Sequence, residues 1–234
     1  MKNTIKYLIL LIIYLVCGVN LQAQNYTFRN VVMSDGLSGL LVNAIYKDSE
    51  GFVWLGTDNC LDRFDGVKVR HYEFRGVDSG RKKRVNCITE TADNQLWVGN
   101  GIGLWRLNRA NGQLERIVPE KIDFAVNTLL PDGDILYIGT EKGLFIQEDG
   151  QLLQVLTDRN MLAACNRIMD LCLNEDKSAL WLATVQGLFS YSLKDGKIDS
   201  WHFQENVPEA DYFRCLTRIG ETLYLGTMSQ GVVR

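Results

Sequence analysis

The chain has 234 residues, of which 46% are hydrophobic and 23% are charged, and its formal net charge is -3. This is the composition of a globular protein with enough apolar residues for a sizeable core. The slightly acidic balance argues against a general nucleic-acid-binding protein, since such domains are usually basic. With 21 glycines and only 3 prolines, the chain suits many tight turns between strands.

The first 24 residues have the pattern of a secretory signal peptide. Lys2 and Lys6 give a positive start, and residues 7–16 form an apolar run of ten residues, which is too short for a comfortable membrane span. In the segment that follows, VNLQAQ, Leu21 and Ala23 stand at the -3 and -1 positions of a signal-peptidase cut. We therefore expect residues 1–23 to be removed and the rest of the chain to be exported.

Two alternatives stay open for this leader. A lipoprotein signal would use Cys17, although residues 14–16 lack the small residue expected just before such a cysteine. A retained membrane anchor is the other alternative. No later segment is long and apolar enough to span a bilayer, so we expect the remainder to be soluble after export.

From residue 42 onward the chain repeats with a period of about 43 residues. Each copy contains a short apolar strand, then an aromatic anchor two residues before a small residue, and then further strands. Successive anchors are 43, 40, 44 and 43 residues apart. The anchors are Trp54, Trp97, Tyr137, Trp181 and Tyr224, and the small residues are Gly56, Gly99, Gly139, Ala183 and Gly226.

Each position of the repeat has a physical explanation. The large anchor fills the space between neighbouring sheets, and the glycine lets another backbone or an aromatic ring approach closely. The next residue is a threonine in every copy but the second, which has Asn100, and its hydroxyl can hydrogen-bond into the coming turn. A second glycine, expected to have a positive φ, follows at positions 103, 143 and 187, and Cys60 replaces it in the first copy.

Four short strands per unit at this period are typical of a β-propeller blade. No segment shows 3.6-residue periodicity of helical length, so the predicted fold class is all-β. The predicted blades cover approximately residues 42–74, 85–118, 126–156, 166–203 and 213–234, and the last of them is incomplete. Residues 26–30 form an additional strand that can supply the outer strand of the last blade.

The first copy resembles the two-component regulator propeller repeat. Residues 33–66 read MSDGLSGLLVNAIYKDSEGFVWLGTDNCLDRFDG, with the family's DGLS opening, its turn from Asp48 to Gly51, its W-x-G-T strand and its closing RFDG. Five copies extend the resemblance over residues 26–234, although the third and fifth are degenerate. The resemblance implies the periplasmic sensor part of a hybrid two-component system, on the periplasmic side of the inner membrane, whose histidine kinase lies outside this chain.

The resemblance also bears on whether the ring of blades closes. The family's propellers typically have seven blades, which would make the blades present here an open arc and the chain the N-terminal part of a longer regulator. In the alternative, residues 26–30 pair beside residues 231–234 and close a five-bladed ring. An open arc exposes an apolar face on each end blade and is expected to be poorly stable alone.

The sequence offers weak candidates for ligand binding. Arg81, Lys82, Lys83 and Arg84 form a basic connection between the first two blades, which is either a solvated loop or a patch that attracts an anionic glycan. Trp201 lies on a predicted outer strand and could stack on a sugar ring. The other tryptophans fall in the repeat register, so packing between blades explains them.

No catalytic, metal or cofactor site is predicted. His71 and His202 fall on outer strands of different blades, too far apart to share a metal ion or to act as a pair. The five cysteines after Cys17 show no CxxC spacing and cannot all pair, which favours buried thiols. Cys87 and Cys215 occupy the same repeat position, which indicates a shared packing slot.

The leading functional hypothesis is an extracellular sensor that recognises a polysaccharide-derived oligosaccharide and signals to a histidine kinase. The ligand class rests on the resemblance alone. The expected partners are that oligosaccharide, the remainder of the kinase and, as an option, a second copy in a homodimer; no nucleic acid is expected. One alternative is a propeller-type glycan hydrolase or lyase, which would need clustered carboxylates or a Tyr/His pair at the channel mouth. A second alternative is a scaffold that binds only proteins.

Overall fold

The computed structural model describes residues 5–7, 28, 30–77, 83–117, 122–156, 167–201 and 212–234. The chain separates into two compact units, Met1–Val31 and Val32–Arg234. In the first unit residues 5–7 are helical, and Phe28 belongs to no strand. Most of the predicted signal peptide and of the predicted strand at 26–30 falls outside the described residues, so both stay predictions. No helix in the described part of the chain is long and apolar enough to cross a membrane.

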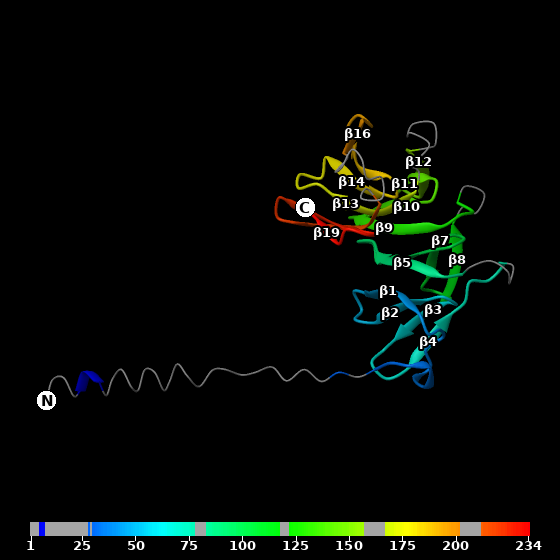
Figure 1. Cartoon of the computed structure of the whole chain (residues 1–234). Coiled ribbons are helices and arrows are strands. Elements are labelled where there is room, and N and C mark those ends of the chain that lie inside the picture. The colour runs from blue at the N-terminus through cyan, green and yellow to red at the C-terminus, as the bar shows by residue number, and fades with distance from the viewer. Residues whose placement is uncertain are drawn as a thin grey trace. The chain divides into compact units, whose positions relative to one another are not determined.

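The second unit contains five antiparallel sheets that follow one another along the chain, drawn from blue to red in Figure 1. The first sheet has β1 (Val42–Lys47), β2 (Val53–Thr57), β3 (Leu61–Phe64) and β4 (Val69–Tyr72). The second has β5 (Val85–Glu90), β6 (Leu96–Asn100), β7 (Gly103–Asn108) and β8 (Gln113–Ile117). The third has β9 (Val126–Asp132), β10 (Ile135–Thr140), β11 (Gly143–Glu148) and β12 (Gln151–Gln154). The fourth has β13 (Ile168–Leu173), β14 (Ala179–Thr184), β15 (Gly187–Ser192) and β16 (Ile198–Trp201). The fifth has β17 (Phe213–Ile219), β18 (Thr222–Thr227) and β19 (Val232–Val233).

This architecture confirms the predicted β-propeller blades, with four complete sheets and an incomplete fifth. A 3₁₀ turn, η1 (Met33–Asp35), precedes β1. The first strands of the sheets pack against one another in chain order, β1 on β5, β5 on β9, β9 on β13 and β13 on β17. Within the described residues β1 and β17 do not pack together in this way. The pairing of residues 26–30 beside residues 231–234 that would close a five-bladed ring falls mostly outside the described residues, so the open arc and the closed ring both stay predictions.

Apolar side chains fill the space between successive blades, as the repeat predicts. Trp54 is 1% exposed and packs between the first and second blades, with its ring 5.1 Å from that of Tyr72. Trp97 and Tyr137 fill the next two interfaces in the same way. Burying one such side chain stabilises the fold by roughly 1.5–3 kcal/mol. These interfaces, rather than any single continuous core, hold the blades together.

In the first three blades, the glycine two residues after the anchor receives a side chain from the next blade. A Cβ on Gly56 would lie 2.4 Å from Cγ1 of Val85, and a Cβ on Gly99 would lie 2.5 Å from Cγ1 of Val126. The expectation of a backbone or an aromatic ring at this position is therefore wrong in detail. The neighbour is an aliphatic side chain, because the first strand of the next blade packs directly on the anchor strand.

The threonine after the glycine closes the turn to the third strand. In the fourth blade Thr184 Oγ1 donates to the carbonyl oxygen of Gly187 at 2.8 Å, and Gly187 has the predicted positive φ of 139°. In the first blade Thr57 Oγ1 makes the same bond to the carbonyl of Cys60 at 2.9 Å. Cys60 is not among the residues with positive φ, so this copy keeps the bond with a different backbone conformation.

Candidate functional site

Each of the five first strands carries a β-bulge at the same repeat position. The register of pairing with the second strand shifts across Asn43, Asn86, Asn127, Met169 and Arg214. A bulge leaves one residue without a partner in the ladder and re-aims its side chain. All five bulged residues line one pocket. Because the bulge recurs in every blade, the five bulged residues meet at one site.

This pocket, which we call the axial pocket, is formed by the first strands of all five blades. Its volume is about 530 Å³, which lies within the range of roughly 300–1,000 Å³ that is usual for small-molecule sites. Arg84 and Arg167 stand directly before β5 and β13 and also line it. The residues that follow four of the bulges complete the lining: Cys87, Thr128, Asp170 and Cys215.

Side-chain amides in the axial pocket link neighbouring blades. Asn86 Nδ2 donates to the carbonyl oxygen of Val126 at 2.9 Å, and Asn127 Nδ2 donates to that of Ile168 at 2.8 Å. Asn43 occupies the same position in the first blade, but its Nδ2 is buried and has no hydrogen-bond partner among the described residues. A buried donor without a partner is costly, so this amide is available to a bound polar group.

Asp170 connects the third, fourth and fifth blades at one wall of the axial pocket. Its Oδ1 accepts from Thr128 Oγ1 and from the backbone N–H of Leu171, each at 2.9 Å. Its Oδ2 accepts from the backbone N–H of Leu216, also at 2.9 Å. Burial raises the pKa of Asp170, while these donors partly offset that effect. The carboxylate is thus engaged in holding the blades together.

Positive charge dominates the axial pocket. Arg84, Arg167 and Arg214 come from the second, fourth and fifth blades, whereas Asp170 is the one carboxylate among the described lining residues. Arg167 has a neighbour in Glu141, with an N···O distance of 3.6 Å. Neither Arg84 nor Arg214 pairs with a carboxylate in the described part of the chain. Guanidinium groups present several donors in a fixed plane and suit carboxylate, sulfate or phosphate groups.

Comparison with protein families finds a match in the first blade. Residues 36–59 match the family model of the two component regulator propeller. The matched residues include β1 and β2, together with the bulge at Asn43.

Two known proteins show what this chain is similar to. Histidine kinase P4 of Formosa agariphila is 32% identical over 79 residues, which are 34% of this chain and 6% of that protein. The extracellular domain of the putative hybrid two component system BT4673 from B. thetaiotaomicron is 25% identical with a TM-score of 0.66, over 82% of this chain and 26% of that one. The chain therefore spans only a small part of the length of either relative. It resembles the extracellular domains of two-component systems.

The propeller fold itself is shared more widely. Virginiamycin B lyase from Staphylococcus aureus has a TM-score of 0.64 over 82% of this chain and 68% of its own, with 14% identity. At that identity the likeness is one of fold only. The side chains that line the axial pocket must therefore be judged by their own chemistry.

Three of the five sequence-predicted ligand-binding residues are among the described residues, Lys83, Arg84 and Trp201, and one of these three lines the axial pocket. That residue is Arg84, and Lys83 beside it is half-buried. Arg81 and Lys82 lie outside the described residues. Trp201 ends β16, is 52% exposed and has its ring 6.0 Å from that of Trp181, away from the pocket lining.

Sequence reasoning missed most of the axial pocket, above all Arg167 and Arg214. A signal was present, because three copies begin their first strand with Val-Asn, at Asn43, Asn86 and Asn127. A polar residue repeated in an otherwise apolar strand indicates a special backbone position. The bulge at this asparagine, however, can be recognised only from the pairing register of the strands.

The cysteines behave mainly as packing residues. The Sγ atoms of Cys87 and Cys215 lie 2.4 and 2.5 Å from where a Cβ of Gly99 and of Gly226 would be, which confirms their shared slot. Cys60, Cys87, Cys172 and Cys215 are free thiols, and Cys215 is exposed rather than buried as predicted. Burial raises the pKa of Cys87, so this thiol is a poor nucleophile. Cys165 and His202 lie outside the described residues.

Proposed function

We propose that this regulator propeller is the ligand-sensing part of a two-component regulatory system and binds an anionic, polysaccharide-derived oligosaccharide in the axial pocket. The repeat over residues 36–59 and the likeness to an extracellular domain of a hybrid two component system support a sensor. The proposal places it, after removal of the leader, on the periplasmic side of the inner membrane. Its partners are then a histidine kinase and a second copy of the sensor.

The observation that carries the proposal is the gathering of three guanidinium groups, from Arg84, Arg167 and Arg214, around one pocket. Neutral sugars need hydrogen-bonding groups, which the asparagines supply. Uronic acids and sulfated sugars add an anionic group, which the arginines can bind in a bidentate manner. Two of the three arginines have no carboxylate partner in the described chain. An anionic sugar therefore fits this lining better than a neutral one.

The position of the arginines also supports a route from binding to signal. A ligand that contacts Arg84 and Arg214 bridges the second and fifth blades across the axis. Hydrogen bonds that Asn86 and Asn127 donate, and one that Asp170 accepts, already couple neighbouring blades at this wall. A ligand can shift the protein between two arrangements only if it binds one of them more tightly. Bridging contacts between blades provide such a difference.

The hydrolase alternative has less support at this pocket. Glycosidases use a pair of carboxyl groups at a defined separation, whereas Asp170 is the one carboxylate among the described lining residues and its oxygens accept from backbone and threonine donors. The scaffold alternative predicts no response to sugars. One set of titrations distinguishes the sensor hypothesis from these two alternatives.

The test titrates the purified chain with trimers of galacturonate, mannuronate and glucuronate and with neutral galactose and mannose trimers. Isothermal titration calorimetry and thermal unfolding report binding, and sugar analysis of the mixture reports turnover. The proposal predicts binding of at least one uronate trimer, none of comparable strength for the neutral trimers, and no change in trimer length. Shortened trimers would support an enzyme. The absence of heat and of any thermal shift with every sugar would support the scaffold alternative.

A further inference from the structure

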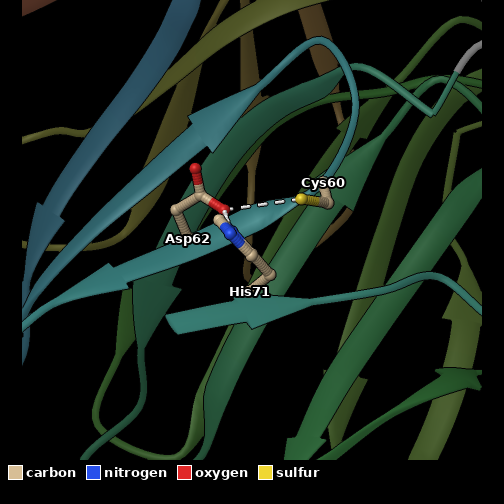
Figure 2. A group of neighbouring side chains, drawn as sticks. All are labelled: Cys60, Asp62 and His71. Atoms are coloured by element: carbon tan, nitrogen blue, oxygen red, sulfur yellow. Dashed lines mark hydrogen bonds and ion pairs between the residues drawn. The ribbon is translucent and has the colours of Figure 1, made fainter. Parts of the chain in front are cut away.

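A second cluster of reactive side chains lies in the first blade, away from the axial pocket. Cys60 directly precedes β3, Asp62 lies in β3, and His71 lies in β4. The antiparallel register places Asp62 directly opposite His71. Figure 2 shows the three side chains pointing toward one another. Their ligand atoms, a sulfur, an oxygen and a nitrogen, all lie within 4.8 Å of one another.

The distances in this cluster are close to those of a tetrahedral metal site. His71 Nδ1 lies 2.7 Å from Asp62 Oδ1, and Cys60 Sγ lies 3.4 Å from the same oxygen. Ligands bound to one Zn²⁺ at about 2.0–2.3 Å are separated by roughly 3.3–3.7 Å. The sulfur and the carboxylate oxygen already have this separation. The imidazole needs to move by less than about 1 Å to match it.

The carboxylate is held in the orientation that a metal ligand needs. Asp62 Oδ2 accepts from the backbone N–H of Ser38 at 2.8 Å and from its hydroxyl at 2.7 Å. Oδ1 therefore faces His71 and Cys60. Supporting hydrogen bonds of this kind orient metal ligands in known sites. The side chain of Asp62 is fully buried and that of His71 is 47% exposed, so an ion has a path from solvent.

The other blades show that the fold does not require polar groups here. The residue aligned with Asp62 is Trp105 in the second blade, and Phe145 and Phe189 occupy the position in the third and fourth. All three aromatic side chains are buried between blades. A buried carboxylate at this position is expensive unless something compensates its charge. The first blade thus replaces an apolar packing position by a group of metal ligands.

We propose that Cys60, Asp62 and His71 form a Zn²⁺ site. Thiolate and imidazole ligands favour Zn²⁺ over Ca²⁺ or Mg²⁺, which prefer oxygen atoms alone. Three protein ligands leave a fourth position for water or another ligand. Binding replaces the thiol proton of Cys60 and the hydrogen bond between His71 and Asp62 by metal–ligand bonds. This site stands independently of the sensor proposal.

The test uses the full chain, stripped of metal and kept reduced, with Zn²⁺ titrated in competition with a chromophoric chelator and with Co²⁺ as a spectroscopic probe. The proposal predicts one Zn²⁺ per chain and, with Co²⁺, a thiolate-to-cobalt charge-transfer band. Cys60→Ser and His71→Gln should weaken Zn²⁺ binding by more than the roughly 10–100-fold that loss of a supporting group costs. Cys60→Ser should also abolish the charge-transfer band.

Cys215→Ser is the matched control, because Cys215 is an exposed thiol outside the cluster. It should leave both the affinity and the cobalt band unchanged. Far-UV circular dichroism of each variant confirms that it is folded, and the two independent variants guard against one that is not. The proposal is overturned if the native chain binds no Zn²⁺ in the competition assay. It is also overturned if both cluster variants bind as the native chain does, or if Cys215→Ser removes the cobalt band.

Discussion

The faces between blades and the axial pocket are built from the same five sheets but from opposite kinds of side chain. Between blades, tryptophan, phenylalanine and aliphatic residues are buried against one another, as with Trp105, which is 1% exposed. Around the axis, the bulged residue is an asparagine or an arginine in four of the five blades. The difference indicates that stability is located between the blades and binding at the axis.

The largest effect should come from a side chain between blades. Trp105→Ala removes a ring that packs 5.0 Å from Phe74 and donates its indole N–H to Asn100 at 3.2 Å. We expect the free energy of unfolding to fall by about 3–5 kcal/mol. Urea denaturation measures it. Trp201→Ala, which truncates a half-exposed tryptophan, should cost less than about 1 kcal/mol. Equal losses in the two variants would contradict the distinction.

Asp170 sharpens the comparison, because it lines the axial pocket yet holds blades together. Asp170→Ala leaves the backbone N–H groups of Leu171 and Leu216 without this acceptor. We expect a loss of about 2–3 kcal/mol in the free energy of unfolding. Asp199→Ala is the control, because Asp199 pairs with Lys197 on the exposed surface and should change stability by less than about 1 kcal/mol. If Asp170→Ala leaves the free energy of unfolding unchanged, the hydrogen bonds of Asp170 do not hold this wall of the pocket together.

The pH dependence of stability gives a second view of Asp170. Burial raises its pKa in the folded state above the ordinary value of 3.8. The folded protein therefore keeps the proton to higher pH than the unfolded chain does. The resulting stabilisation is fully present below pH 3.8 and is lost as pH rises through the folded pKa. Urea denaturation from below that value to neutrality should show the native chain losing stability relative to Asp170→Asn. A constant difference between the two proteins would contradict it.

The contact between blades can be tested at its tightest point. Gly99→Ala places a Cβ 2.5 Å from Cγ1 of Val126 in the next blade and 2.4 Å from Cys87 Sγ. We expect a loss of about 1–3 kcal/mol from overpacking. At Gly226 the close neighbour is Cys215 Sγ, and no side chain of another blade lies within 4 Å in the part of the chain that the structure describes. Gly226→Ala should therefore cost less, and thermal unfolding of the two variants compares them. A larger loss at Gly226 would refute the packing explanation.

The smallest effect on stability should come from the arginines at the axis. The double variant Arg84→Gln, Arg214→Gln removes two exposed cations that have no carboxylate partner among the described residues. We expect the free energy of unfolding to change by no more than about 0.5 kcal/mol. Urea denaturation tests this together with the other variants. A loss comparable to that of Trp105→Ala would show that the axis, too, is structural.

The sequence predicts the blades well because their determinants are local. Aromatic anchors, glycines and threonines recur at fixed spacing, and each acts within its own strand or on the adjacent blade. Trp54, Gly56 and Thr57 play the roles predicted for them, with an aliphatic side chain as the neighbour of the glycine. A period of about 43 residues leaves little freedom in how such units stack.

The sites are harder to predict because they depend on register and on convergence of distant strands. Met169 and Arg214 replace the asparagines of the earlier copies, and only the bulges reveal that these positions share a pocket. The proposed zinc ligands are also hard to predict, because they too depend on strand register. Asp62 and His71 meet because β3 and β4 pair in one particular register, and the spacing of Cys60, Asp62 and His71 in the chain matches no standard zinc motif.

The most direct test of binding at the axis is calorimetric titration of the galacturonate, mannuronate and glucuronate trimers into three proteins: the native chain, Arg84→Gln with Arg214→Gln, and Arg106→Gln as an arginine control outside the pocket. The account predicts that a trimer bound by the native chain is bound equally by Arg106→Gln. It should be bound at least about tenfold more weakly by the double variant, since each charge-assisted hydrogen bond contributes about 1.5–3 kcal/mol. Equal affinity in all three proteins, or no binding of any trimer to the native chain, would contradict it.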